Sequence, residues 1–252
     1  MTTAIGLCNL PGASMDAVKT ARHLIEQAKA AKRDALDEPA AKRVLQAFGI
    51  KTPSSAVIQS ADDIDKALQG LTTPVVLKLI SPDVLHKSDF SAVILGLSDA
   101  PAIAGAMRDI SQRCLEHGYE VDGFLLEETI GHGHEIVIGG YRDDAFGPVI
   151  MFGLGGVFVE ILQDVTFRIC PITEIDAKEM IEELRGAPLL QGARGGIAVP
   201  GQILVNALLA VGGQHGLLVE LADLVKELDI NPLLAGAQGV TALDARIVFA
   251  GD

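Results

Sequence analysis

The sequence contains no tryptophan and only two tyrosines, and its acidic residues outnumber its basic ones. Lysine and arginine number 20 against 33 aspartates and glutamates, which gives a formal net charge of -13. Proteins that hold unpaired bases stack them on aromatic side chains, and a strongly negative field repels nucleic-acid backbones and anionic lipids. These shortages argue against a nucleic acid or a membrane surface as partner. A small anionic ligand remains compatible with them, because a pocket can be locally basic.

Cysteine is also scarce. Cys8, Cys114 and Cys170 are odd in number and widely spaced, and no C-x-x-C pair occurs, so neither a zinc site nor a disulfide framework is expected. We expect buried, reduced thiols in a cytoplasmic protein. The N-terminus lacks the basic lead and apolar core of a signal peptide. The longest stretch without charge, residues 195–219, is interrupted by polar residues and proline, so no membrane span is expected.

What the sequence does contain is an alternation of helix and strand patterns. Helix starts are marked by capping residues such as Ser14 and Thr173, and helix ends by glycines such as Gly49 and Gly118. We predict an α+β fold of two lobes, with a ligand cleft between them. The predicted divisions are a helical lead over residues 1–36, a first lobe over 37–121 and a second lobe over 122–252.

Two details of this prediction bear on the site. The first helix is expected to run from about Met15 to Leu36, followed by a second helix over EPAAKRVLQAFG. Near the C-terminus, KELDINPLLAGAQGVTALDARIVF is expected to form two strands joined by a turn at residues 236–239.

A lysine interrupts the apolar strand VVLKLI, and a basic loop follows it. Lys78 must project from one face of this strand, either as a snorkelling lysine at a sheet edge or as a point charge directed at a phosphate. The loop carries His86, Lys87 and Asp89. A neutral imidazole is a competent nucleophile, a neighbouring lysine can stabilise negative charge delivered to it, and a carboxylate can orient the ring. A solvated loop is the alternative.

Acidic and amide side chains gather in the C-terminal segment. Asp229 and Asn231 are two residues apart and therefore share one face of a strand, and Asp244 is expected on the next strand, opposite them. Carboxylate and amide oxygens are donors that magnesium prefers. The alternative is a solvated strand face on which an aspartate pairs with Arg246.

Further charged residues lie near the expected lobe junction. Glu127, Glu128 and Glu135 could accept hydrogen bonds from an adenine amine or a ribose, or could be exposed linker charges. Arg194 lies in a glycine-containing loop and could contact an anion. The Gly153-Leu-Gly-Gly156 segment follows neither the P-loop nor the dinucleotide-binding spacing, so it indicates only bent or closely packed backbone.

Four segments carry a family resemblance. PVVLKLISPDVLHKSD, FGPVIMFGLGGVFVEILQDVTFR, KELDINPL and ALDARI resemble, in order and spacing, the ATP-grasp module of nucleoside-diphosphate-forming acyl-CoA synthetases. That module is the β subunit of enzymes such as ADP-forming acetate–CoA ligase, and it is distantly related to the β subunit of succinyl-CoA synthetase. The resemblance extends from about residue 36 to residue 250.

The resemblance implies an ATP-grasp fold that holds ATP or ADP with magnesium between two lobes. It implies an acid–thiol ligase converting acyl-CoA, ADP and phosphate to carboxylic acid, CoA and ATP, with a phosphoryl group carried on His86. By the same resemblance, the nucleotide would be bound by Lys78, Glu127, Glu128 and Glu135, and magnesium by Asn231 and Asp244, with Asp229 adjacent. Lys87 and Arg194, from their own loops, are further candidates for binding the nucleotide.

The resemblance has one departure and one consequence. Members of the family commonly carry two glycines after the histidine loop, where this chain has Phe90-Ser91-Ala92. Non-glycine residues disfavour positive φ, so the hold on the nucleotide could differ there. No CoA-binding domain is evident, so a partner α subunit in a hetero-oligomer would supply it. Two alternatives stay open: an ATP-grasp carboxylate ligase that makes a free acyl phosphate, and a non-catalytic nucleotide-binding regulatory subunit.

Overall fold

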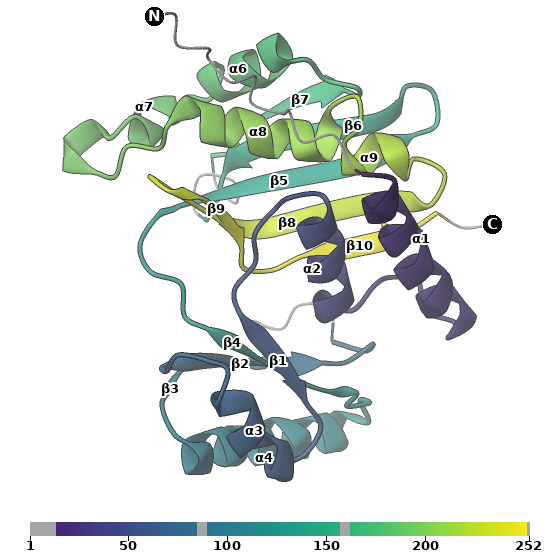
Figure 1. The fold of residues 1–252 in the computed structure, drawn as a ribbon, viewed down its shortest axis with the longest axis vertical. Coiled ribbons are helices and arrows are strands. Elements are labelled where there is room, and N and C mark those ends of the chain that lie inside the picture. Colours follow the sequence, from purple (N-terminus) through teal and green to yellow (C-terminus); the bar gives the residue numbers. More distant parts are fainter. Residues whose placement is uncertain (1–13, 85–89, 157–161, 251–252) are drawn as a thin grey trace, which may run out of the picture.

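A computed structural model describes residues 14–84, 90–156 and 162–250. Within them the chain forms two antiparallel sheets, each with its own helices and its own hydrophobic core. Figure 1 shows the small lobe below the large lobe, with the chain passing between them through a few extended segments. The α+β prediction is confirmed.

The small lobe has a four-stranded sheet of order β1-β4-β2-β3. Helices α3 and α4 pack on one face of this sheet around residues such as Leu77 and Ile110, which are fully buried. Its elements are β1 (Ser55–Ile58), η1 (Ala61–Asp63), α3 (Ile64–Leu68), β2 (Val75–Ile80), β3 (Val93–Leu97), α4 (Ala100–His117) and β4 (Gly123–Glu128).

The large lobe has a six-stranded sheet of order β10-β8-β5-β6-β7, with β9 also paired to β8. Helices from both ends of the chain share its core. Its elements are α1 (Met15–Ala30), α2 (Glu38–Ala47), β5 (His134–Asp143), β6 (Gly147–Leu154), β7 (Val165–Ile169), α6 (Glu174–Glu182), α7 (Ala187–Leu190), η2 (Ala193–Gly195), α8 (Gly201–Gly212), α9 (Leu217–Glu220), β8 (Val225–Gly236), β9 (Gly239–Ala242) and β10 (Arg246–Phe249).

The capping residues act as the sequence predicts. The Ser14 side chain accepts a hydrogen bond from the Ala17 amide at the start of α1, and Thr173 with Asp176 forms a reciprocal capping box at α6. Gly118 ends α4 in the left-handed conformation, with φ 72°. These local signals need no distant partner, which is why the sequence alone identifies them.

The structure divides the chain differently from the predicted ranges. The lead helix α1 is no separate unit, because Leu24 and Ile25 lie in the same core as helix α2 and the large sheet. Strand β4, expected to open the second lobe, pairs with β1 and β2 and so belongs to the small lobe. The small lobe is therefore an insertion between α2 and β5, and residues 129–133 lead back to the large lobe.

The first helix is also shorter than predicted. It ends at Ala30, since Lys32 takes a positive φ of 57°, and Ala35 then forms an isolated antiparallel bridge with Val248. A long-range pairing of this kind competes with helix continuation, and the local periodicity does not reveal it.

Candidate active site

Four buried charged side chains meet where the lobes face each other. Two are acidic and two basic, and each is at most 7% exposed: Glu38, Lys42, Lys78 and Glu127. We call these four residues the charge quartet. Helix α2 of the large lobe supplies the first two, and strands β2 and β4 of the small lobe supply the others. Buried charges of this kind persist only when they are paired.

The positions of the small-lobe pair follow from strand geometry. On β2, Val75, Leu77 and Leu79 face the helices of their own lobe, so the alternate residue Lys78 faces the large lobe. Strand β2 lies between β4 and β3, and Val76 pairs with Glu127, which puts that carboxylate on the same face as Lys78. Lys78 is thus not an edge lysine that snorkels to solvent.

The quartet is tightly connected. The Lys42 Nζ lies 2.7 Å from Glu38 Oε1 and 2.6 Å from Glu127 Oε1. The Lys78 Nζ lies 2.7 Å from Glu38 Oε1, 2.8 Å from Glu127 Oε2, and 2.6 Å from the carbonyl oxygen of Leu243 in the large lobe. Each carboxylate therefore accepts hydrogen bonds from both ammonium groups.

The two lysines differ in their acid–base behaviour. Burial lowers the pKa of Lys78, but the carboxylates of Glu38, Glu127 and Asp244 outweigh this effect, so its net pKa lies above that of an ordinary lysine. Burial also lowers the pKa of Lys42, and the positive charge of Lys78 lowers it further. The carboxylates offset this only in part, so the net pKa of Lys42 falls. Lys78 is the securely charged member of the pair.

The expected magnesium ligands lie on strand β8 and in the connection after β9, and Asp244 among them acts electrostatically on Lys78. Asp229 and Asn231 are exposed residues of β8, and the Leu243 amide donates to the Pro232 carbonyl beside them. Asp244 is not on a strand, which corrects the prediction: it lies in the connection between β9 and β10, where its Oδ1 accepts from the Ala245 amide. Strand β10 begins only at Arg246, which lies opposite Asp229 in the antiparallel register of β10 and β8.

These residue types fit a magnesium ion. Two carboxylates and one amide oxygen are donors that the ion accepts while it keeps waters and substrate phosphates in its shell. Within residues 14–84, 90–156 and 162–250, no group of three or more His, Cys, Asp or Glu side chains is arranged to hold a metal ion.

The adjacent glutamates of β4 have separate environments. Glu127 lies in the quartet, whereas the Glu128 carboxylate accepts a hydrogen bond of 2.7 Å from the Thr72 amide. This backbone hydrogen bond, with further hydrogen bonds from the Thr72 and Ser54 side chains, lowers the pKa of Glu128. Successive strand residues point to opposite faces, so the two carboxylates do not act as one pair.

Glu135 lies at the start of β5, and the segment after Arg194 contacts the same end of this strand. A Cβ on Gly156 would lie 3.6 Å from Glu135 Oε2, so the glycine-rich segment passes close to that carboxylate. The neighbouring His134 Nε2 lies 2.7 Å from the Ile197 carbonyl oxygen, which ties the segment after Arg194 to β5. Strand β5 is the first element that the chain enters after leaving the small lobe, so Glu135 lies close to that connection in the sequence.

The predicted nucleophile, His86, and its neighbour Lys87 lie outside the described residues. The chain on both sides of their loop is anchored to the end of α4. Asp83 Oδ2 accepts from the Glu120 amide at 2.7 Å, and the Phe90 ring lies 5.3 Å from the His117 ring. Ser91 adopts φ 53°, so at one of the positions where the family commonly has glycine, serine takes a left-handed conformation.

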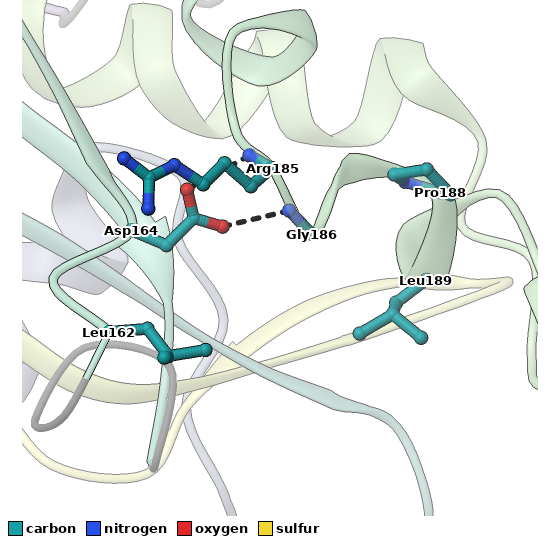
Figure 2. A pocket seen from close by; sticks show the side chains of 6 residues that line it. All are labelled: Leu162, Asp164, Arg185, Gly186, Pro188 and Leu189. Atoms are coloured by element: carbon teal, nitrogen blue, oxygen red, sulfur yellow. Dashed lines mark hydrogen bonds between the residues drawn. The ribbon is translucent and has the colours of Figure 1, made fainter.

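A cavity of about 290 Å³ lies beside the start of β7. Figure 2 shows the Asp164 carboxylate pointing to the Gly186 amide, with Leu162 and Leu189 at the edges of the cavity. The buried carboxylate already accepts hydrogen bonds from the amides of Arg185 and Gly186, at 2.9 and 2.8 Å. Both oxygens of this carboxylate are thus held by backbone donors, which indicates a structural role for Asp164.

Asp164 is expected to stabilise the fold. Asp164→Ala should lower the free energy of unfolding by about 1–3 kcal/mol, because two backbone donors lose a charged acceptor. Urea denaturation measures the change, and Asp164→Asn, which retains one acceptor oxygen, should lie between the two proteins. An alanine variant as stable as the wild type would contradict this role.

Sequence reasoning did not identify Glu38 and Lys42. The available signal was weak: an i, i+4 Glu–Lys pair at the start of a helix is typical of a solvent-exposed face. Within the described residues, the expectation of buried thiols is confirmed. Cys114 and Cys170 are buried free thiols, and burial raises the pKa of Cys170 to about 12. No helix there is long and apolar enough to cross a membrane.

Two α+β lobes, with a strand lysine and acidic residues at their junction, define an ATP-grasp architecture. The sequence model of the ATP-grasp domain matches residues 27–249. The β subunit of ADP-forming acetate–CoA ligase I from Pyrococcus furiosus is 40% identical over 237 residues, which cover 93% of this chain and 100% of that subunit. The chain therefore belongs to the ATP-grasp family, among the β subunits of ADP-forming acyl-CoA synthetases.

Other similar proteins differ in length or have been solved with ligands. The 4-hydroxybutyrate–CoA ligase (ADP-forming) of Nitrosopumilus maritimus is 35% identical over 90% of this chain, which spans only 32% of that enzyme. A chain of acetyl-coenzyme A synthetase 1 from Ca. Korarchaeum cryptofilum, solved with coenzyme A and Ca-AMPCP, matches with a TM-score of 0.85 and 36% identity, over 91% of this chain and 100% of that one. A complex of the same enzyme with Mg-AMPPCP has its phosphohistidine segment directed towards the nucleotide site (TM-score 0.75, 34% identity, 91% of this chain and 100% of that one).

Proposed function

We propose that this chain is the nucleotide-binding β subunit of an ADP-forming acyl-CoA synthetase. The reaction converts acyl-CoA, ADP and phosphate to a carboxylic acid, CoA and ATP. The observation that carries the proposal is the full-length match to a β subunit of this class, with the lysine and carboxylates of the motifs gathered at the lobe junction.

In this proposal the phosphoryl group passes from the His86 imidazole to ADP. A terminal oxygen of the ADP β-phosphate attacks phosphorus, the N–P bond breaks and the P–O bond of ATP forms. The imidazole, which carries a proton on its other ring nitrogen, keeps that proton and leaves as a neutral base. Lys78 and Lys87 stabilise the phosphate charge during transfer. In this proposal Glu128 and Glu135 accept hydrogen bonds from the base or the ribose, Arg194 contacts a phosphate, and Glu127 of the same nucleotide site holds Lys78.

Magnesium, when bound, would neutralise phosphate charge and fix the position of the phosphates. Its protein ligands in this proposal are Asn231 and Asp244, with Asp229 adjacent. Support comes from their oxygen donors and from Asp244, which acts electrostatically on Lys78.

The rest of the reaction requires a partner. The chain spans the whole of a β subunit but a third of a longer ligase, so the remaining two thirds of that ligase are the counterpart of a separate α subunit. We propose that this partner binds CoA and the carboxylic acid and forms a hetero-oligomer with the chain. A cytoplasmic location agrees with the reduced, buried cysteines.

Phosphoryl transfer from labelled ATP tests this function. After incubation with magnesium and γ-labelled ATP, with the partner subunit present, the chain should carry label that is lost in acid and retained in alkali. A carboxylate ligase acting through a free acyl phosphate would leave the chain unlabelled while its reaction proceeds. A regulatory subunit would show a thermal shift with Mg·ATP, with neither label nor turnover.

A further inference from the structure

All three donors of the Lys78 ammonium group are engaged within the protein. A lysine ammonium has three N–H groups. Here three acceptors lie within 2.8 Å of it: Glu38 Oε1, Glu127 Oε2 and the Leu243 carbonyl oxygen. A nucleotide phosphate that binds Lys78 must therefore replace at least one of these acceptors.

Lys42 is placed to make that exchange possible. Its ammonium lies within 2.7 Å of both carboxylates that hold Lys78, and it is only 3% exposed. If Lys78 gives a donor to a phosphate, Glu38 and Glu127 each keep a cationic partner. Without Lys42, a step in which Lys78 releases Glu38 or Glu127 would leave that buried carboxylate with less positive charge beside it, which is unfavourable.

Charge balance leads to the same conclusion. The quartet contains two positive and two negative side chains, and Asp244 adds a further negative charge near Lys78. Removing the charge of Lys42 would make the surroundings of Lys78 more negative and would strengthen the hold of both carboxylates on Lys78. Both effects oppose the approach of an anionic phosphate.

We infer that Lys42 is a positioning residue for nucleotide binding: it retains Glu38 and Glu127 while Lys78 exchanges a protein acceptor for a phosphate oxygen. This inference rests on the proposed function, because it takes the ligand of Lys78 to be a nucleotide phosphate. Lys42 itself belongs to helix α2 of the large lobe, and Lys78 belongs to the small lobe.

Calorimetric titration of the full chain with Mg·ADP tests the inference. Lys42→Met keeps the length and apolar stem of the side chain, and it should weaken the affinity at least about tenfold. The double variant Glu38→Gln/Lys42→Met removes one charge of each sign and should bind within about threefold of the wild type. A purely structural role would make the double variant at least as defective as the single one, which would overturn the inference.

Two further measurements keep the outcomes distinct. If Lys42→Met does not fold, as shown by thermal unfolding, Glu38→Gln and the double variant decide the matter. Glu38→Gln leaves an excess positive charge and should bind Mg·ADP at least as tightly as the wild type, so a tenfold loss in this variant would overturn the inference. Equal binding by the wild type and Lys42→Met would overturn this inference alone. A wild-type chain that bound no nucleotide would overturn the proposed function, and this inference with it.

Discussion

His86→Asn is expected to abolish turnover of the assembled enzyme and the acid-labile label on the chain. Asparagine resembles one edge of the imidazole ring but has no nucleophilic nitrogen, so no N–P bond can form. Loss of a covalent nucleophile lowers activity by at least about a thousandfold. The rate of ATP formation from acyl-CoA, ADP and phosphate gives the first readout, and label retained from γ-labelled ATP gives the second.

A second histidine provides the control. His23 is an exposed residue of α1, and His23→Asn should leave both turnover and labelling unchanged. The binding of Mg·ADP by His86→Asn should persist, because the proposed nucleotide contacts lie elsewhere. Full turnover in His86→Asn would show that the phosphoryl group takes another route.

Lys78→Met is expected to destabilise the protein and to remove nucleotide binding together. It removes one of the two quartet lysines from the buried carboxylates of Glu38 and Glu127, and the loss of one partner from a buried ion-pair network costs about 3–5 kcal/mol. Urea denaturation measures the free energy of unfolding, and titration with Mg·ADP measures binding at a temperature where the variant is folded.

The same substitution at the surface is the matched control. Lys226 pairs with Glu227 at 3.7 Å on the exposed side of β8, and Lys226→Met should change the free energy of unfolding by less than about 0.5 kcal/mol. If Lys78→Met were as mild as this control, the quartet would not be an important stabilising contact.

The pH dependence of the Lys78 contribution has a definite sign. Its pKa is higher in the folded protein than the value of about 10.4 for an unfolded chain. The stabilisation is therefore fully present below about pH 10 and declines only as the pH rises towards the folded pKa. The difference in unfolding free energy between wild type and Lys78→Met should accordingly stay constant between about pH 6 and pH 9.

Much of the site could be predicted where a residue carries its own signal. Lys78 stands out because a lysine inside an apolar strand conflicts with burial, and Asp229 and Asn231 share a face because of strand period. The prediction that Asp244 lies on a strand is wrong. The strand-like sequence pattern continues past Ala242, and only the pairing of β9 and β10 with β8 shows that Asp244 lies in the connection between them.

By itself, the sequence determined the helix caps, most of the strands, the α+β class and the family, because these depend on neighbouring residues or on motifs read in order. Only the tertiary structure decided that Glu38 and Lys42 belong to the charge quartet at the lobe junction. In the sequence, Glu38 is 40 residues from its partner Lys78, and Lys42 is 85 residues from its partner Glu127. No local pattern distinguishes a Glu–Lys pair on a solvent-exposed helix face from one buried against a second lobe. The fold decides whether such a pair is exposed or buried. These charges can be buried only where charges from the other lobe pair with them.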